Sequence, residues 1–203
     1  SRWLHIAAEE PRTLYGLLAN RALGAIPEFY WEPQALTNND LDVVLAVPAV
    51  VRAIALYEVG QTARASKEVL RIQYRATPEI ARALLALATA LQLPALETSL
   101  GGRLGAIDGR RHDFAVYPVP GWVPDNGFTV DPALIYALIR QESRFKETAK
   151  SRRGARGVMQ VMPNTARFAA RSAGLGRISR DALMIPETNI AIGQAYVGHL
   201  LEH

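Results

Sequence analysis

The sequence predicts an all-α protein, because apolar residues recur at helical spacing along most of the chain while strand signals are almost absent. Helix start and stop residues also punctuate the apolar runs at short intervals. The one strand candidate is residues 115–119, and its proline favours an extended linker instead. With 203 residues, 49% of them hydrophobic, the chain has room for one large domain or two small ones.

Start and stop signals divide the first half of the chain into successive predicted helices. They cover residues 3–8, 11–24, 39–47, 48–60, 61–76, 78–92 and 94–100. Asn39 and Thr77 stand where N-caps are preferred, and Pro48, Pro78 and Pro94 suit first turns. These helices are rich in alanine and leucine and carry polar faces. We therefore expect consecutive antiparallel pairs, as in an α-solenoid.

Glycine and proline accumulate between Gly101 and Phe128, which we interpret as a domain junction. The predicted domains are residues 1–111, a partial helical superhelix with its linker, and residues 112–203, a second helical domain. In the second domain, helices are predicted over 131–143, 163–172 and from 186 onward, around a glycine-bearing loop at 151–163. Several apolar positions of the last helix have no downstream segment to pack on, so we expect this domain to be truncated. They are Ile190, Ile192, Ala195, Tyr196 and Leu200.

Glu142 is predicted to lie on the apolar stripe of the helix 131–143. Asp131 can cap this helix, and Pro132 suits its first turn. The stripe consists of Leu134, Ile135, Leu138 and Ile139. Glu142 follows Leu138 by four residues and Ile139 by three, so it falls on the same face. A carboxylate there is either paired with a cation or kept protonated by desolvation, and an acid that keeps its proton suits general acid catalysis.

The loop 151–163 suits sugar binding. Its glycines allow tight turns and a close approach of the backbone to a ligand. Ser151 and Gln160 offer neutral hydrogen bonds for hydroxyl and acetamido groups. Met159 and Met162 offer adaptable apolar surface. Each of these side chains is also suited to a plain structural role, in a turn or in the core.

A dense pattern of motif residues surrounds these positions. The chain reads Glu-Ser-x-Phe at 142–145, Ala-x-Ser at 149–151 and Gly-Ala-x-Gly-x-Met-Gln-x-Met-Pro-x-Thr-Ala at 154–166. Pro-Glu-x-Asn-Ile-x-x-Gly-x-x-Tyr follows at 186–196. With this spacing the chain resembles the soluble lytic murein transglycosylases. Thr-Leu-Tyr-Gly-x-Leu-Ala at 13–19 and Tyr-Pro at 117–118 resemble segments that precede the catalytic domain in the large members.

The resemblance implies a goose-lysozyme-like catalytic domain attached to a helical superhelix. It also implies cleavage of the β-1,4 bond between N-acetylmuramic acid and N-acetylglucosamine in peptidoglycan. The product is a 1,6-anhydromuramoyl end, so the reaction is that of a lyase. Glu142 is then the one general acid and base, and four residues bind substrate: Ser151, Met159, Gln160 and Met162. In the family a downstream tyrosine segment forms the opposite groove wall, so we expect residues 1–203 alone to be inactive.

Residue chemistry alone leaves other functions open. Glycoside hydrolysis usually employs two carboxylates. Asp131 is explained as a helix cap, Glu147 lies in a polar stretch, and Glu187 lies in a first helical turn where a negative charge is favourable. None of them has a compelling position as a second acid. The alternatives are a lysozyme-type peptidoglycan hydrolase and a non-catalytic helical scaffold that binds wall polymer.

The amino-acid composition limits which catalytic groups, cofactors and binding partners the protein can have. The chain contains no cysteine, which excludes disulfides, thiolate metal sites and a thiol nucleophile. Its four histidines are dispersed, so we predict no metal and no other cofactor. A net charge of +4 favours anionic polymers. We expect peptidoglycan glycan strands as partners rather than nucleic acid, with peripheral association to cell wall or outer membrane. We also expect a monomer exported to the periplasm, although the sequence contains no signal peptide.

Overall fold

The computed structural model describes residues 1–73 and 75–202. Tyr74, which falls in a predicted helix, and His203, the end of the predicted second domain, lie outside the described residues. The described residues form α-helices and one 3₁₀ turn but no strand, as predicted, and none of these helices is long and apolar enough to cross a bilayer. The chain divides into two compact units, Ser1–Trp31 and Glu32–His203. The boundary expected after residue 111 lies within the second unit and stays a prediction.

The first unit is a pair of helices, α1 (Arg2–Ala8) and α2 (Leu14–Leu23). The Thr13 hydroxyl caps α2 by accepting a hydrogen bond from the backbone N–H three residues later, at 3.0 Å. The Asn20 side chain donates to the Ala8 carbonyl at 3.0 Å and so ties α2 to the end of α1. Both predicted helices of this segment are confirmed.

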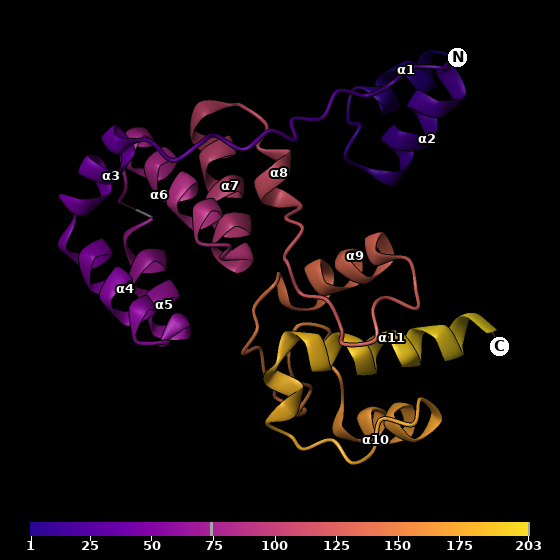
Figure 1. The fold of residues 1–203 in the computed structure, drawn as a ribbon. Helices are drawn as coiled ribbons and strands as arrows, with labels where there is room; N and C mark the ends of the chain where they lie inside the picture. The colour runs from indigo at the N-terminus through magenta and orange to yellow at the C-terminus, as the bar shows by residue number, and fades with distance from the viewer. Residues whose placement is uncertain (74, 203) are drawn as a thin grey trace. The chain divides into compact units, whose positions relative to one another are not determined.

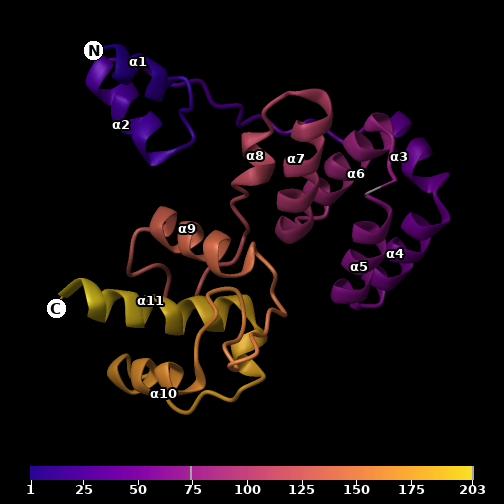
Figure 2. The same ribbon diagram turned by 180° about the vertical axis from the view of Figure 1, so that it is seen from behind.

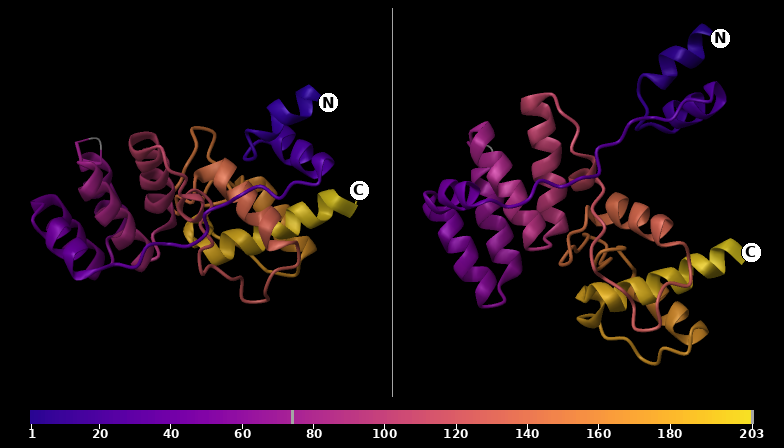
Figure 3. Two further views of the ribbon diagram at one scale, coloured as in Figure 1. Left: turned by 90° about the horizontal axis from the view of Figure 1, so that it is seen from above. Right: turned by 45° about the horizontal axis from the view of Figure 1, so that its top comes forward.

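The second unit begins with an array of helices. They are α3 (Asn38–Leu45), α4 (Pro48–Glu58), α5 (Thr62–Ile72), α6 (Pro78–Ala90), α7 (Pro94–Asp108) and the short α8 (Asp113–Val116). Neighbours pack in pairs, α4 with α5 and α6 with α7, while α3 lies against α6 (Figures 2 and 3). Leu84, Leu100 and Leu104 are fully buried in the apolar core that these helices share. The alternation of alanine and leucine thus builds the expected helical pairs.

Local predictions within this array need correction. The N-cap of α3 is Thr37 rather than Asn39: the Thr37 N–H donates to the Asp40 carboxylate at 2.9 Å, and the Asp40 N–H donates to the Thr37 hydroxyl at 3.2 Å. The helix expected to end at residue 100 continues through Gly101. A Cβ at this glycine would lie 2.6 Å from the Cβ of Ala115, so the glycine allows close packing of α7 against α8. The segment expected to be extended is helical in its first part, as α8.

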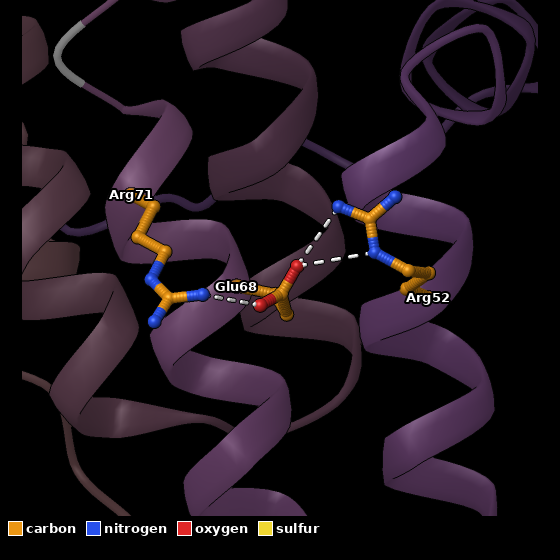
Figure 4. A network of polar contacts seen from close by, with 3 residues as sticks. All are labelled: Arg52, Glu68 and Arg71. Atoms are coloured by element: carbon orange, nitrogen blue, oxygen red, sulfur yellow. Dashed lines mark hydrogen bonds and ion pairs between the residues drawn. The ribbon is translucent and has the colours of Figure 1, made fainter.

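Figure 4 shows the polar network that joins α4 to α5. The Glu68 carboxylate accepts hydrogen bonds from Arg52 at 3.0 and 3.2 Å and from Arg71 at 2.9 Å. The arginine side chains are 61% and 75% exposed, whereas that of Glu68 is 17% exposed. Exposed ion pairs stabilise a fold by less than about 1 kcal/mol each. Apolar packing therefore accounts for most of the cohesion of the array.

The last part of the chain is built around a central helix. Its elements are α9 (Pro132–Ser143), α10 (Pro163–Ser172), the 3₁₀ helix η1 (Ala182–Met184) and α11 (Pro186–Glu202). In Figure 1, α11 lies between α9 and α10. Ile190 of α11 packs with Ile135 and Ile139 of α9, and Ile192 packs with the alanines of α10. The expectation that these two residues of α11 lack partners is therefore wrong, because earlier segments cover them. Leu200 remains 57% exposed.

Candidate functional site

Glu142 lies in the last turn of α9 and is exposed. The expected burial is therefore wrong. Ile135 and Ile139 are fully buried and define the face of α9 that packs on α11. At about 100° per residue, Glu142 is rotated by about 60° from Ile139. Seven residues separate Glu142 from the fully buried Ile135, so the two lie within about 20° of each other around the helix. The apolar spacing identified the helix and its buried face correctly, but not that this face is left uncovered at Glu142, in the last turn.

The remainder of α9 is held firmly in place. Asp131 is the N-cap, as predicted, and accepts a hydrogen bond from the Ala133 N–H at 2.8 Å. Arg140 donates through Nε to the Val116 carbonyl at 2.9 Å, and its guanidinium carbon lies 4.5 Å from the ring centroid of Tyr117. Arg140 is thus engaged away from the glutamate. Among the residues described, Glu142 forms no ion pair, so its carboxyl group is open to solvent and to a ligand.

The loop 151–163 is a series of tight turns. The Ser151 hydroxyl accepts from the Ala155 N–H at 3.0 Å, so this side chain shapes a turn as well as offering a hydroxyl. Gln160 has a positive φ of 48°, and its side chain donates to the Gly157 carbonyl at 2.9 Å. Val158 is fully buried against α9 and α11. The apolar contact of Val158 therefore fixes the loop against α9.

The predicted substrate residues differ in how accessible they are. Ser151, Met159 and Gln160 are half-buried, while Met162 is 39% exposed and precedes α10. The structure gathers all four in one ordered loop. None of the hydrogen bonds of the described residues joins them to Glu142. The role of Glu142 as general acid stays a prediction, and so do the roles of the four loop residues as substrate contacts.

Asn189, in the first turn of α11, was not among the predicted site residues. It is fully buried, and its Oδ1 accepts from the Met159 N–H at 2.8 Å. Its Nδ2 donates to the carbonyl oxygens of Arg156 at 2.9 Å and Leu183 at 2.8 Å. In the sequence, Asn189 is one of the motif residues at 186–196, in the first turn of a predicted helix, where a capping or solvated role is usual. Its three bonds to distant backbone are evident only in the fold.

Two glutamates that had no compelling role in the sequence interact electrostatically. Burial raises the pKa of Glu147, and the negative charge of Glu187 raises it further. Glu147 also lines a cleft of about 420 Å³ between the end of α9 and helices α5 and α7, together with Lys67, Arg144 and Lys146. Among the described residues, no group of three acidic, histidine or cysteine side chains is arranged to hold a metal ion.

Comparisons with known proteins agree with one another. The family model described as "Transglycosylase SLT domain" matches residues 124–203. Soluble lytic murein transglycosylase from Escherichia coli (strain K12) is 36% identical over 78 residues, which cover 38% of this chain and 12% of the relative. Endo-type membrane-bound lytic murein transglycosylase A from Cronobacter sakazakii is 39% identical over 89 residues, which cover 40% of this chain and 43% of the relative.

Solved structures match over nearly the whole chain. The 70 kDa soluble lytic transglycosylase from Escherichia coli has a TM-score of 0.79 at 22% identity, covering 98% of this chain and 32% of that one. Lytic transglycosylase Slt from Pseudomonas aeruginosa, solved as an inactive glutamate-to-glutamine mutant, has a TM-score of 0.80 at 23% identity, covering 98% and 33%. These likenesses confirm the fold. The chain spans about one third of the length of these proteins. The match of the family model and the fold together support the resemblance: residues 124–203 match the SLT transglycosylase domain, and the fold is similar to that of soluble lytic transglycosylases.

Proposed function

We propose that the protein carrying this chain is a peptidoglycan lytic transglycosylase in which Glu142 is the single general acid and base. The observation that carries the proposal is the position of Glu142 within the SLT domain, at the end of α9 and free of any ion pair among the described residues. The relatives are named murein transglycosylases, and one solved relative is inactive with a glutamine in place of a glutamate. A single carboxyl group on which activity depends is consistent with this role.

The proposed reaction begins with proton transfer from the Glu142 carboxyl group to the glycosidic oxygen between N-acetylmuramic acid and N-acetylglucosamine. The bond from that oxygen to the anomeric carbon breaks, and the acetamido carbonyl of the muramoyl residue stabilises the oxocarbenium-like centre. The Glu142 carboxylate then takes the proton of the muramoyl 6-hydroxyl, whose oxygen bonds to the anomeric carbon. This step closes the 1,6-anhydro ring and restores the acid without consuming water.

The exposure of Glu142 defines what the bound glycan has to supply. A carboxylate has no proton to donate, and removal of water favours the protonated form of a carboxyl group. In the proposed complex, the sugar rings on Glu142 provide this desolvation, together with the groove wall that the family resemblance assigns to a downstream segment. Ser151 and Gln160 would then bind hydroxyl and acetamido groups, and Met159 and Met162 would contact sugar faces and acetyl methyl groups.

The proposed location follows from the substrate. Murein strands lie outside the inner membrane, so we place the enzyme in the periplasm, in peripheral contact with the cell wall or outer membrane. The net charge of +4 favours association with an anionic polymer, and this association weakens as salt screens the charges.

Purified murein sacculi test the proposal. The intact protein is incubated with sacculi, and the soluble products are analysed by mass spectrometry. Anhydro-muropeptides are expected. Products with a reducing muramic acid would instead indicate a lysozyme-type hydrolase, and binding to sacculi without any product would indicate a scaffold. Glu142→Gln is expected to abolish turnover while the circular dichroism spectrum and melting temperature stay unchanged. Glu147→Gln tests a two-carboxylate mechanism, which loss of activity in this variant would support.

A further inference from the structure

We propose that Asn189 is a positioning residue that holds Met159 and Gln160 in the arrangement that contacts the glycan. The inference rests on the proposed function, because it assigns a purpose to the geometry of the substrate loop. Asn189 touches no substrate in this scheme and acts through the loop backbone. Its side chain contacts the backbone of Met159 and Arg156 in the substrate loop and of Leu183 in η1.

All of the side-chain hydrogen bonds of Asn189 depend on a carboxamide. The side-chain oxygen accepts one backbone N–H, and the side-chain nitrogen donates both of its hydrogens to backbone carbonyl oxygens. An aspartate has the same shape but cannot donate, and it would bring a charge into a fully buried site. An alanine would leave a buried N–H and two buried carbonyl groups without this partner.

The loop is shaped around the Asn189 amide. A Cβ added at Gly157 would lie 2.3 Å from Asn189 Nδ2 and 2.1 Å from the Leu183 carbonyl oxygen. Gly157 also has a positive φ of 73°, so only glycine fits this position without displacing the amide. Asn189 and Gly157 therefore form a matched pair, one on α11 and one in the loop.

Gly157 in turn fixes the conformation of Gln160. The carbonyl oxygen of Gly157 accepts from the Gln160 backbone N–H at 3.1 Å and from its side-chain Nε2 at 2.9 Å. These bonds hold Gln160 at a φ of 48°, a conformation that costs energy for a residue with a Cβ. Without the hydrogen bonds of Asn189, the backbone strain at Gln160 can relax more easily. Both the Gln160 amide and the Met159 side chain would then move.

Gln194 supplies a matched control on the same helix. It is also buried, and its amide bonds backbone at both ends, accepting from the Thr129 N–H at 3.0 Å and donating to the Gly127 carbonyl at 3.0 Å. These contacts fix the segment before α9 and not the substrate loop. A substitution of Gln194 therefore lowers the stability of the fold by removing a buried amide from α11, but it does not disturb Met159 or Gln160.

The structural part of the inference is tested by amide hydrogen exchange measured by NMR on residues 1–203. In the unmodified chain, the Asn189 side-chain NH₂ and the Met159 N–H are expected to exchange slowly. Asn189→Ala is expected to speed exchange at Met159 and Gln160 at least tenfold and to leave Thr129 unchanged, and Gln194→Ala is expected to do the reverse. Rapid exchange of the Asn189 NH₂ in the unmodified chain would overturn the inference without any variant having to fold.

The functional part is tested with the intact protein and soluble glycan strands. Asn189→Asp and Asn189→Ala are expected to raise KM at least tenfold with a smaller fall in kcat, whereas Gln194→Ala changes neither by more than twofold. Folded Asn189 variants with unchanged KM would refute the positioning role. If the unmodified protein cleaves no glycan, the proposed transglycosylase function fails, while the exchange data still decide whether Asn189 orders the loop.

Discussion

The thioether of Met159 lies directly against Gly193 of α11. A Cβ added at Gly193 would lie 2.3 Å from the Met159 sulfur and 2.8 Å from its methyl carbon, closer than atoms can approach. The absence of a side chain at Gly193 thus makes the space that Met159 occupies. The helix that carries Asn189 therefore positions the substrate loop at a second point.

Gly193→Ala is expected to displace Met159 without unfolding the chain. Alanine stabilises a helix interior by about 1 kcal/mol over glycine, which offsets the cost of moving a flexible side chain, so the free energy of unfolding should change by less than about 1 kcal/mol. Affinity for glycan strands should fall severalfold, measured by titration of the intact protein. Gly198→Ala is the control, since its Cβ would meet only Val130 at an ordinary 3.9 Å. Equal affinities of the two variants for glycan would show that the position of Met159 does not affect glycan binding.

Loss of the Glu68 charge should have a small effect on stability. Glu68→Gln removes two ion pairs, but both arginine partners are largely exposed, so we expect a loss of less than about 1 kcal/mol per pair. Urea unfolding at low and high salt measures it, and the difference between variant and parent should shrink at high salt because the pairs are screened. A loss that is larger and independent of salt would mean that Glu68 acts through packing.

The sequence predicts helices well where a capping residue or a proline marks their start. Pro48, Thr77 and Asp131 act locally, through backbone angles and the first unpaired N–H groups, so no knowledge of the fold is required to place them. The end of α7 was predicted wrongly at residue 100, because the role of Gly101 is tertiary: the absence of a side chain there lets Ala115 of α8 pack closely.

The same difference between local and tertiary contacts explains which features of the site could be predicted. The motif residues identify the substrate loop, since their spacing in the chain is itself the signal. The exposure of Glu142 could not be predicted, because it depends on where the neighbours of α9 end. The contacts of Asn189 with Met159 and Arg156 and the electrostatic interaction of Glu147 with Glu187 join residues 30 or more positions apart. Such pairs leave no periodic pattern in one sequence.

Glu97 should make the stability of the helical array depend on pH. This residue of α7 is 8% exposed, and burial raises its pKa from 4.5 to about 7, while a hydrogen bond from Thr89 at 3.4 Å lowers it somewhat. Because the folded form holds the proton more tightly than the unfolded form, the stabilisation is complete below pH 4.5. It is lost as pH rises through 7, by up to about 3 kcal/mol.

Glu97→Gln should therefore flatten this pH dependence. The amide is neutral throughout, so the variant should be more stable than the parent at pH 8 and similar to it at pH 4. Urea unfolding at both values gives the comparison, with the exposed Glu58→Gln as the control for a change of charge. A variant that loses as much stability as the parent between pH 4.5 and 8 would show that Glu97 is not the responsible group.

Removal of the Glu187 charge should lower the pKa of Glu147. Burial is the larger cause of the raised pKa and remains in Glu187→Gln, so the pKa of Glu147 should fall yet stay above 4.5. Titration of the Glu147 carboxyl carbon by NMR measures the change, with Asp181→Asn as a control that removes an exposed carboxylate nearby in sequence. Since a raised pKa makes Glu147 stabilise the fold below pH 4.5 and less so as pH rises, Glu187→Gln should also weaken that part of the pH dependence. An unchanged pKa would mean that the two carboxyl groups do not face each other in solution.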